Sequence, residues 1–446
     1  MAGSVSRLPR DPGPAGWNAL LPDAAVPVHQ EGALNADWLV IGAGFAGLAA
    51  AYRLAQLCPG DRVVVLEASR VGEGPAGRNS GFMIDLPHDL ASDNYGGALE
   101  ADLAQTADNR RGIALAAEMA RVYGLSAEAF VQSGKINGAA GPRGDRHNAE
   151  FAEHLQAMGE PFEMLDAAAM KDLTGTGYYT GGLFTPGAAM IQPALFVRSV
   201  AGGLVSNRVL VFEDSPVTGL TRKNDDWIAT TPCGTVAAPQ VILAVNGHLQ
   251  SFGYMPRRLI HVFTYASMTR ALTDEECARL GGAAVWGLTP ADPLGTTVRR
   301  ISGTGGDRIV IRNRFTFDPS MEVPDARLTR VGKDHDRAFA DRFPMLGSIP
   351  MEYRWGGRLC LSLNNVQVVG ELEPGLWSAC CQNGLGTARG TLAGMLAAEA
   401  ANGVTSAALE RMRQAEAPKK LPPGLIARAG AAARLRWGEW RAGAEL

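Results

Sequence analysis

The chain has 446 residues, more than one compact core usually holds, so we expect at least two domains and exclude small disulfide scaffolds and lone binding modules. Hydrophobic residues make up 46% and charged residues 20%, an ordinary globular composition, so disorder is expected only near the ends. With 42 Lys and Arg against 45 Asp and Glu, the net charge of −3 provides no general attraction to nucleic acid or to an anionic membrane.

Cysteine spacing and hydropathy bear on the compartment. The six cysteines are scattered, and no two have the two-residue spacing of a zinc or redox motif, so we expect free thiols and no metal site. The opening residues lack the apolar core of a signal peptide, and no run of 18 apolar residues occurs. The default expectation is a soluble cytoplasmic protein.

The first predicted elements form one compact unit. Residues 1–35 are rich in Pro, Gly and Ala and predict an irregular N-terminal arm that lies over the body. Residues 38–41 are an apolar run typical of a strand buried on both faces, residues 48–57 repeat apolar side chains at helical spacing, and residues 62–67 form a second such strand. Strand, helix and strand within 30 residues predict a parallel βαβ unit.

Later segments have simpler patterns. Residues 98–123 predict one or two helices, with Arg110 and Arg111 on a solvated face. Short strands are predicted at 209–212, 227–230 and 241–244, as in a small meander that rejoins a sheet, an antiparallel strand at 308–317, and a helix at 392–401.

The glycine cluster of residues 42–47 lies where a dinucleotide fingerprint belongs, between a predicted strand and a predicted helix. Gly42 permits the tight turn, Gly44 lets the backbone approach a pyrophosphate, and Gly47 lets helix and strand pack closely. Glu67 ends the next strand, where its carboxylate can accept both ribose hydroxyls of an adenosine. Phosphates are therefore expected at the start of the helix.

A second glycine-rich stretch, residues 72–81, separates FAD from NAD as the expected cofactor. It follows the acidic residue directly and holds Arg78 and Asn79 among residues that adopt unusual backbone angles. Such a segment can wrap the far phosphate and the ring system of a longer cofactor, which NAD domains seldom need.

These motifs resemble those of the D-amino-acid-oxidase-like FAD-dependent oxidoreductases, most closely the γ-glutamylputrescine oxidoreductase branch, with sarcosine and glycine oxidases more distant. The resemblance spans roughly residues 36–405 and is most specific in its first third. It is carried by Ile41 to Gly47, Glu67-Ala68-Ser69, Gly77-Arg78-Asn79-Ser80-Gly81 (family GRNGG), Trp355-Gly356-Gly357, and Gly384-Leu385-Gly386-Thr387, which answers the family's glycine-histidine-glycine.

The resemblance implies an α/β (α+β) fold with two interleaved domains. A Rossmann-like FAD-binding domain with a parallel sheet would be built from 36–97, 185–250 and 350–404, and an antiparallel-sheet substrate domain from 98–184 and 251–349, with an arm at 1–35 and a helical tail at 405–446. Residues 244–247 fall where the family returns a strand to the adenosine. The implied FAD-binding residues are Gly42, Gly44, Phe45, Ala46, Gly47, Glu67, Ala68, Ser69, Gly77, Arg78, Asn79, Ser80, Gly81, Gly384, Leu385, Gly386 and Thr387.

The activity implied is oxidation of a small amine or amino acid, by hydride transfer to the flavin N5 and hydrolysis of the resulting imine, with O2 or another electron acceptor. The cofactor performs the difficult step, so the protein needs aromatic walls more than acid–base residues. Candidates are His261, Phe263 and Tyr265, which alternate along one predicted strand, and Trp355, which matches a position near the flavin edge. Core packing is the alternative role for each. His88 is a further candidate for the pocket.

Arg312 and Arg314 place two guanidinium groups on an otherwise apolar strand, and alternation predicts that they share a face. A buried pair of like charges needs an anion, so we expect Arg314, with Arg312, to bind a carboxylate, phosphonate or sulfonate of the substrate. The alternative is a solvated edge strand in which Asp318 or Glu322 is the partner.

Three features depart from the family. No lysine occurs between Asp307 and Asp318, the strand on which sarcosine oxidases carry an oxygen-activating lysine, so a dehydrogenase remains open. Leu385 replaces the usual histidine. Cys360 lies past the position of the cysteine in covalent-flavin relatives, which favours noncovalent FAD.

Two other functions remain open: an FAD-dependent 2-hydroxy-acid dehydrogenase, with His261 or His88 as its base, and a flavin-binding subunit of a hetero-oligomeric amine dehydrogenase. The tail from 405 to 446 has eight Lys and Arg against four Asp and Glu. Packing over its own domain is the favoured prediction for this tail, and membrane contact is the alternative.

Overall fold

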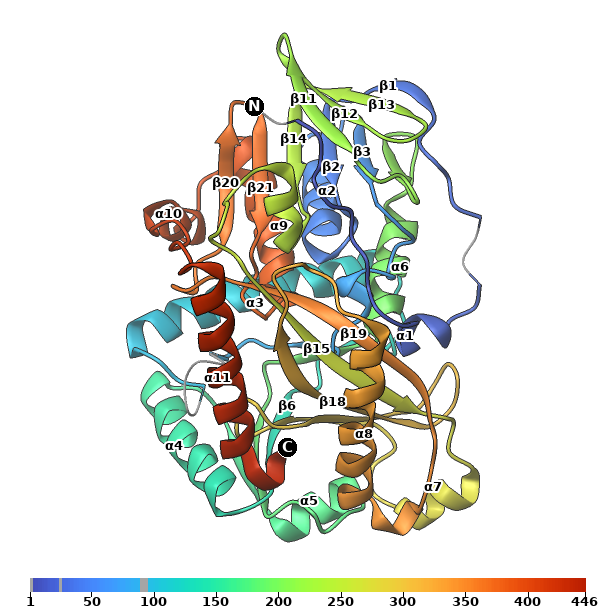
Figure 1. The fold of residues 1–446 in the computed structure, drawn as a ribbon, viewed down its shortest axis with the longest axis vertical. Coiled ribbons are helices and arrows are strands. Elements are labelled where there is room, and N and C mark those ends of the chain that lie inside the picture. Colours follow the sequence, from blue (N-terminus) through green and yellow to red (C-terminus); the bar gives the residue numbers. More distant parts are fainter. Residues whose placement is uncertain (1–2, 24–25, 89–94) are drawn as a thin grey trace.

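The computed structural model describes residues 3–23, 26–88 and 95–446. Two large sheets divide the molecule into an upper and a lower part (Figure 1). The upper, six-stranded sheet has the order β10-β3-β2-β14-β21-β20. Its strands are β10 (Val209–Phe212), β3 (Val63–Leu66), β2 (Trp38–Ile41), β14 (Gln240–Leu243) and β21 (Leu376–Cys380), all parallel, and the antiparallel edge strand β20 (Val368–Glu373). The predicted βαβ unit and the mixed fold class are confirmed.

Each face of this sheet has its own cover, which is why its central strands are apolar throughout. One face packs on α2 (Phe45–Leu57), α3 (Leu99–Val122), α6 (Pro193–Leu204) and α9 (Ala388–Ala401). The other face packs on a four-stranded sheet of β1 (Gly32–Asn35), β13 (Gly234–Ala238), β12 (Asp226–Thr230) and β11 (Gly219–Lys223). The sheet therefore forms the middle of three layers, and only the ends of its strands are open to a ligand.

The lower sheet has eight strands in the order β19-β15-β18-β17-β16-β6-β8-β7, antiparallel except between β16 and β6. They are β19 (Met351–Leu361), β15 (Ile260–Thr269), β18 (Arg308–Phe317), β17 (Thr297–Ile301), β16 (Trp286–Pro290), β6 (Lys135–Ala139), β8 (Gly181–Thr185) and β7 (Glu163–Asp166). In this part lie α4 (Pro142–Met158), α5 (Ala167–Thr174), α7 (Asp274–Leu280), α8 (Asp325–Arg342) and α11 (Gly424–Ala442) (Figure 1).

The remaining elements are small. A three-stranded sheet joins β4 (Phe82–Met83), β9 (Ala189–Ile191) and β5 (Phe130–Val131). Two short helices are α1 (Gly16–Ala19) and α10 (Ala407–Gln414), and the 3-10 segments are η1 (Pro75–Gly77), η2 (Asn246–Phe252), η3 (Pro344–Leu346) and η4 (Gly443–Glu445).

Several local predictions need adjustment. The predicted meander is present as β11, β12 and β13. Residues 209–212 are not part of this meander, because they form β10 of the parallel sheet. The arm at 1–35 is not wholly irregular, since it contains α1 and β1. Arg110 is half exposed yet binds Asp85 and Glu160, so it is more than a solvated residue.

The division of the chain into domains stays a prediction. One pairing bears on its boundaries, because β19 is hydrogen-bonded to β15 along its length and so lies in the eight-stranded sheet. The segment 350–404, assigned by the prediction to the FAD-binding domain, thus contributes its first strand to the eight-stranded sheet. The tail at 405–446 is helical, as α10 and α11.

Candidate functional site

A large cavity lies between the two sheets. Together with the open space at its mouth, it takes in about 2130 Å³. Its upper wall is made of the turns that follow β2, β3, β14 and β21, and its lower wall of residues of β15, β18 and β19. The turns after parallel strands meet at one edge of a sheet, where ligands of open α/β sheets bind.

The first glycine turn has the geometry of a phosphate cradle. Gly42 has φ of +103°, and a Cβ atom there would lie 2.8 Å from the carbonyl oxygen of Ala244. A Cβ at Gly47 would lie 1.7 Å from the carbonyl oxygen of Gly42, so only glycine lets α2 begin this close to the turn. Gly44 is the N-cap of α2, and the first N–H groups of that helix point toward the cavity edge with no partner within the helix.

Glu67 lies beside this turn, at the end of β3. Its Oε2 accepts the N–H of Ala43 at 2.7 Å, and its Oε1 accepts the N–H groups of Ala68 at 2.9 Å and Ser69 at 3.3 Å. Burial raises the pKa of Glu67, while these three donors act against the rise. The carboxylate is therefore held in place, and its remaining lone pairs are available to the hydroxyls of a ribose.

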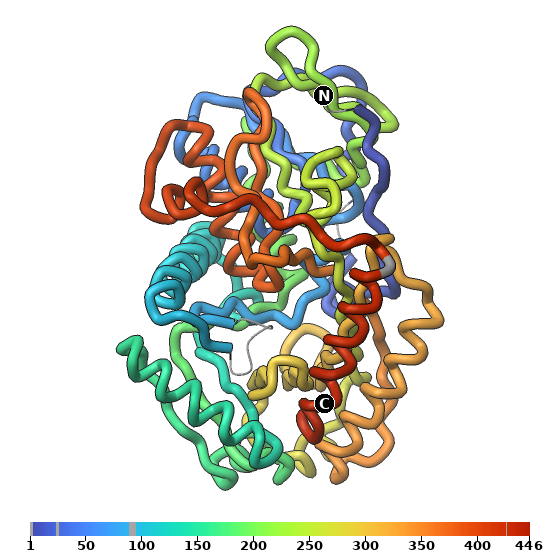
Figure 2. The backbone as a smooth tube through the Cα atoms, turned by 60° about the vertical axis from the view of Figure 1, so that its left-hand side comes forward, coloured from blue at the N-terminus to red at the C-terminus, as the bar shows by residue number. Residues whose placement is uncertain are grey.

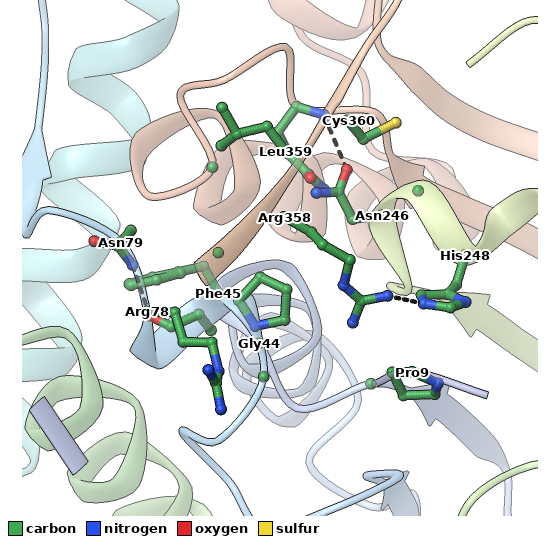
Figure 3. Close-up of a pocket in the computed structure, with 18 of the residues that line it drawn as sticks. Pro9, Gly44, Phe45, Arg78, Asn79, Asn246, His248, Arg358, Leu359 and Cys360 are labelled. Carbon is green, nitrogen blue, oxygen red and sulfur yellow. Dashed lines mark hydrogen bonds between the residues drawn. The ribbon is translucent and has the colours of Figure 1, made fainter. Parts of the chain in front are cut away.

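The second glycine-rich segment is shaped by its own side chains. The amide of Asn79 donates to the carbonyl oxygen of Ala76 at 2.6 Å and accepts the N–H of Gly81 at 2.8 Å. Nη1 of Arg78 donates to the carbonyl oxygens of Pro12 and Gly13, at 3.0 and 2.8 Å. These hydrogen bonds fix the loop, and Figure 3 shows Arg78 and Asn79 near Phe45 among the residues that line the cavity.

A third turn, Gly384 to Thr387, lines the cavity before α9. Oγ1 of Thr387 donates to the carbonyl oxygen of Phe82 at 2.6 Å, which joins this turn to β4. All of the predicted cofactor residues line the cavity except Gly47, Gly77 and Gly81. A Cβ on any of these three would lie within 2.0 Å of another atom, so they shape the turns from outside.

The residues present fit FAD. Two glycine-built turns and a helix N-terminus suit a pyrophosphate, Glu67 suits the adenosine ribose, and the same cavity is lined by a third turn and by residues of β15 and β19. Residues 244–247 line the same cavity, at the place expected for the adenosine side. The sequence motifs, far apart in the chain, thus meet around one space.

Arg312 and Arg314 do not share a face. Thr264 of β15 pairs with Phe315, and Tyr265 pairs with Asn313, so Arg314 is the extra residue of a β-bulge with φ of +59°. The prediction from strict alternation is wrong here, because the bulge redirects one side chain. Arg314 binds Asp334 at 3.0 Å and Glu439 at 2.8 Å instead of lining the cavity.

Arg312 lines the cavity on the substrate side. Its guanidinium lies 4.5 Å from the ring centroid of Phe315, and no described carboxylate pairs with it. Burial lowers the pKa of Arg312 to about 10, which leaves the guanidinium charged at neutral pH. A desolvated cation of this kind costs free energy until an anion reaches it.

The candidates for the aromatic walls also fall into two groups: some line the cavity, and others are buried away from it. His261 and Tyr265 line the cavity, whereas Phe263 is buried beside Val331. Trp355 is fully buried in a cluster with Trp17, and its Nε1 donates to the carbonyl oxygen of Arg78 at 3.0 Å. Trp355 is thus a core residue that supports the second glycine-rich segment.

The histidines at the cavity are neutral. Nε2 of His261 lies 2.6 Å from Oε1 of Gln250, and burial lowers the pKa of His261 to about 4. The ring of His88 stacks on that of Tyr95, with 4.2 Å between the ring centroids. Nδ1 of His88 has no hydrogen-bond partner among the described residues, and burial lowers the pKa of His88 well below the usual value. Both imidazoles are weak proton acceptors.

Sequence reasoning missed Lys135. This buried side chain of β6 donates to Asn137 and to Oγ1 of Thr289, which lines the cavity, and burial lowers the pKa of Lys135 to about 8. A lone lysine in an apolar strand was the available signal. It adds positive charge behind the substrate side of the cavity.

A second group that sequence reasoning missed lies at the cavity mouth. Arg358 of β19 points to His248 of η2 (Figure 3), and Pro9 of the N-terminal segment lines the same cavity. Nothing in the local pattern marks these residues, because they come from three distant parts of the chain.

The remaining predictions concern the cysteines, metal ligands and membrane-spanning helices. All six cysteines are free thiols; Cys360 lines the cavity and is buried. Within the described ranges, no three His, Cys, Asp or Glu side chains gather as metal ligands would. Among the same residues, no helix combines the length and apolar character needed to cross a bilayer.

Comparison with known proteins agrees with this geometry. The model of the DAO family, described as "FAD dependent oxidoreductase", matches residues 37–400. The chain is 27% identical over 377 residues to a probable oxidoreductase OrdL of Haemophilus influenzae, covering 82% of this chain and 83% of that one. It is 26% identical over 380 residues to the γ-glutamylputrescine oxidoreductase of Escherichia coli, covering 83% and 84%. Among solved structures, the glycine oxidase of Geobacillus kaustophilus is similar in fold, with a TM-score of 0.68, 18% identity and coverage of 84% and 96%.

Proposed function

This chain belongs to the DAO family of FAD-dependent oxidoreductases, and from that premise we propose that it oxidises a small primary or secondary amine or amino acid bearing an acidic group. The name of the E. coli relative indicates action on γ-glutamylputrescine, an amine. The product would be an imine, which water hydrolyses to an aldehyde or oxo acid and ammonia or an amine.

FAD, when bound, accepts the hydride that leaves the carbon next to nitrogen. The chain's part is to bind the amine in its neutral form, to hold its C–H bond toward the ring, and to exclude water. Thr264, Tyr265 and Ala266 of β15 are consecutive residues that all line the cavity. Tyr265 is fixed by a hydrogen bond of 2.6 Å with Thr316.

The position of Arg312 is the observation that supports an acidic group on the substrate. It is the cation of β18 that faces the cavity, it lacks a carboxylate partner among the described residues, and its guanidinium is held against Phe315. A guanidinium binds a carboxylate, phosphonate or sulfonate through two parallel hydrogen bonds. Lys135, behind Thr289, adds to the positive potential felt by such an anion.

The protonation of the histidines favours an amine over an alcohol. Oxidation of a 2-hydroxy acid needs a base for the hydroxyl proton, and both His88 and His261 have a lowered pKa. An amine that binds neutral has no such proton to lose before hydride transfer.

The test is anaerobic bleaching of the flavin in the purified chain. The substrates offered are N-alkyl glycines, ω-amino carboxylates, aminoalkyl phosphonates and sulfonates, the methyl esters of the carboxylates, and 2-hydroxy acids. We expect at least one acidic amine to bleach the flavin and release ammonia or an amine in equal amount, while its ester reacts far more slowly. Bleaching by 2-hydroxy acids alone would contradict the proposal.

The same preparation identifies the electron acceptor and tests for a missing subunit. Admitting air to the bleached protein measures reaction with O2, and adding a quinone or dye measures transfer to another acceptor. Bleaching in the isolated chain excludes the interpretation as a flavin-binding subunit, whereas bleaching only after a cell extract is added would support it.

A further inference from the structure

Residues 3–13, the first described part of the N-terminal segment and called the arm from here on, form part of the wall of the cofactor cavity. Val5, Arg7, Leu8 and Pro9 line the same cavity as the glycine turns. The match to the DAO family model begins at residue 37, so this wall lies outside the residues that the family model covers. In Figures 1 and 2 the dark blue chain descends from the N-terminus past the six-stranded sheet toward the middle of the molecule.

The outer end of the arm is attached to the layer above the cavity. Ser4 forms an antiparallel bridge with Gly219, and the N–H of Val5 donates to the carbonyl oxygen of Thr218 at 2.8 Å. The N–H of Ser6 then donates to the carbonyl oxygen of Ser251 in η2 at 2.9 Å. These are backbone contacts, so they fix the path of the arm without depending on flexible side chains.

Beyond the cavity mouth, the arm is attached to the other sheet. Asp11 and Arg358 form a two-pronged ion pair, Nε to Oδ1 and Nη2 to Oδ2, each 3.0 Å long, with both side chains less than one tenth exposed. The N–H of Gly356 donates to the carbonyl oxygen of Pro12 at 3.1 Å. Gly13 has φ of +71°, and a Cβ there would lie 2.4 Å from the carbonyl oxygen of Arg354.

Trp17 anchors the segment that follows. Its side chain is fully buried beside Trp355, and its Nε1 donates to the carbonyl oxygen of Asn79 in the second glycine-rich segment at 2.8 Å. The arm is thus held at both ends, and the chain between them covers the space that the glycine turns form for FAD.

We propose that residues 3–13 form a wall of the FAD site, closed by the buried Asp11–Arg358 ion pair, so that release of FAD requires the arm to detach. Arg358 lines the cavity and contacts Asp11 and His248 together, which makes it the residue that joins arm, η2 and β19. The inference concerns the cofactor, so it stands or falls separately from the amine substrate.

The experiment measures FAD release from the full-length holoenzyme, as the rise of free-flavin fluorescence after dilution. The variants are Asp11→Asn, which keeps the size of the side chain, and a deletion of residues 2–9, which keeps Asp11 and Trp17. We expect release at least about tenfold faster in both, because a buried guanidinium loses its partner in one and the wall is absent in the other. The matched control is Arg10→Ala, an exposed change in the same arm that leaves the cavity lining intact.

Limited trypsin digestion of the unchanged chain gives a second readout. Saturating FAD should slow cleavage after Arg7 at least severalfold, while cleavage after the exposed Lys420 in the tail keeps its rate. Thermal unfolding of the apoproteins shows whether a variant is simply unstable. Release rates equal to that of the unchanged chain in both variants, or cleavage after Arg7 that ignores FAD, would overturn the proposal.

Discussion

Nη1 of Arg314 donates a hydrogen bond of 2.8 Å to Oε2 of Glu439, and this contact ties the C-terminal helix α11 to the strand that carries Arg312. The other oxygen of Glu439 accepts the N–H of Phe315 at 3.2 Å, and Asp334 of α8 binds the same guanidinium. The carboxylates of the protein itself therefore satisfy Arg314. Two arginines only two residues apart have different tasks.

Arg314→Ala should lower stability and leave substrate binding unchanged. It removes a partly buried ion pair to two helices, so we expect the free energy of unfolding to fall by about 1–3 kcal/mol. Urea unfolding of the variant measures this loss. The KM for an acidic amine should stay within about twofold. A large rise in KM without loss of stability would mean that Arg314 reaches the substrate.

Arg312→Ala should have the opposite profile. Loss of a desolvated guanidinium should lower kcat/KM for acidic amines roughly 100-fold. The neutral ester of the same amine should react with similar efficiency in both proteins, because it has no carboxylate that could pair with the guanidinium of Arg312. Arg312→Lys keeps a point charge without the fork and should fall between the two. Steady-state kinetics with the paired substrates measures the difference.

Gly47→Ala should abolish tight FAD binding. The added Cβ would lie 1.7 Å from the carbonyl oxygen of Gly42, so the turn must move away from its cradle geometry. The expected product is a colourless protein whose Kd for FAD, measured by fluorescence titration, rises at least about 100-fold. Gly60→Ala is the matched control, since a Cβ there meets no atom within 4 Å and should leave the protein yellow.

Glu445 should make stability depend on pH. Burial raises the pKa of this carboxyl to about 7 from an ordinary 4.5, and its Oε2 accepts the N–H of Asp292 at 2.6 Å. The folded protein therefore binds the proton more tightly than the unfolded chain does. The contribution of protonated Glu445 to the free energy of unfolding is fully present below about pH 4.5. It is lost as the pH rises through 7, and the free energy of unfolding falls by up to about 3 kcal/mol.

Urea unfolding of the Glu445→Gln variant between pH 4.5 and 8 checks this sign. The stability of the variant relative to the unchanged chain should rise with pH, because an amide does not titrate. Glu416→Gln changes an exposed carboxyl of the same tail and should show no such trend. A difference between Glu445→Gln and the unchanged chain that is constant with pH would contradict the shift.

Much of the cofactor site could be predicted from sequence because its determinants are local. The spacing of Gly42, Gly44 and Gly47 encodes a turn within six residues, and β2, α2 and β3 follow from short apolar patterns. Glu67 follows at a fixed distance along the same βαβ unit. Each of these inferences needs only residues that are close in the chain.

The substrate side could not be predicted in the same way, because it depends on pairing between distant strands. The alternation of β18 suggested that Arg312 and Arg314 share a face, but the register with β15 inserts a bulge between them. Trp355 was expected near the flavin, yet it packs against Trp17 in a buried cluster. The cavity mouth likewise joins Pro9, His248 and Arg358 from three separate segments.

The sequence by itself therefore determined the nucleotide-binding turn and its acidic residue, since backbone freedom at glycine and the charge of one carboxylate are properties of single positions. Only the tertiary structure decided which charged side chains face the cavity. Whether a guanidinium is paired or unpaired depends on the carboxylates that folding brings near it, and for Arg314 these come from α8 and α11.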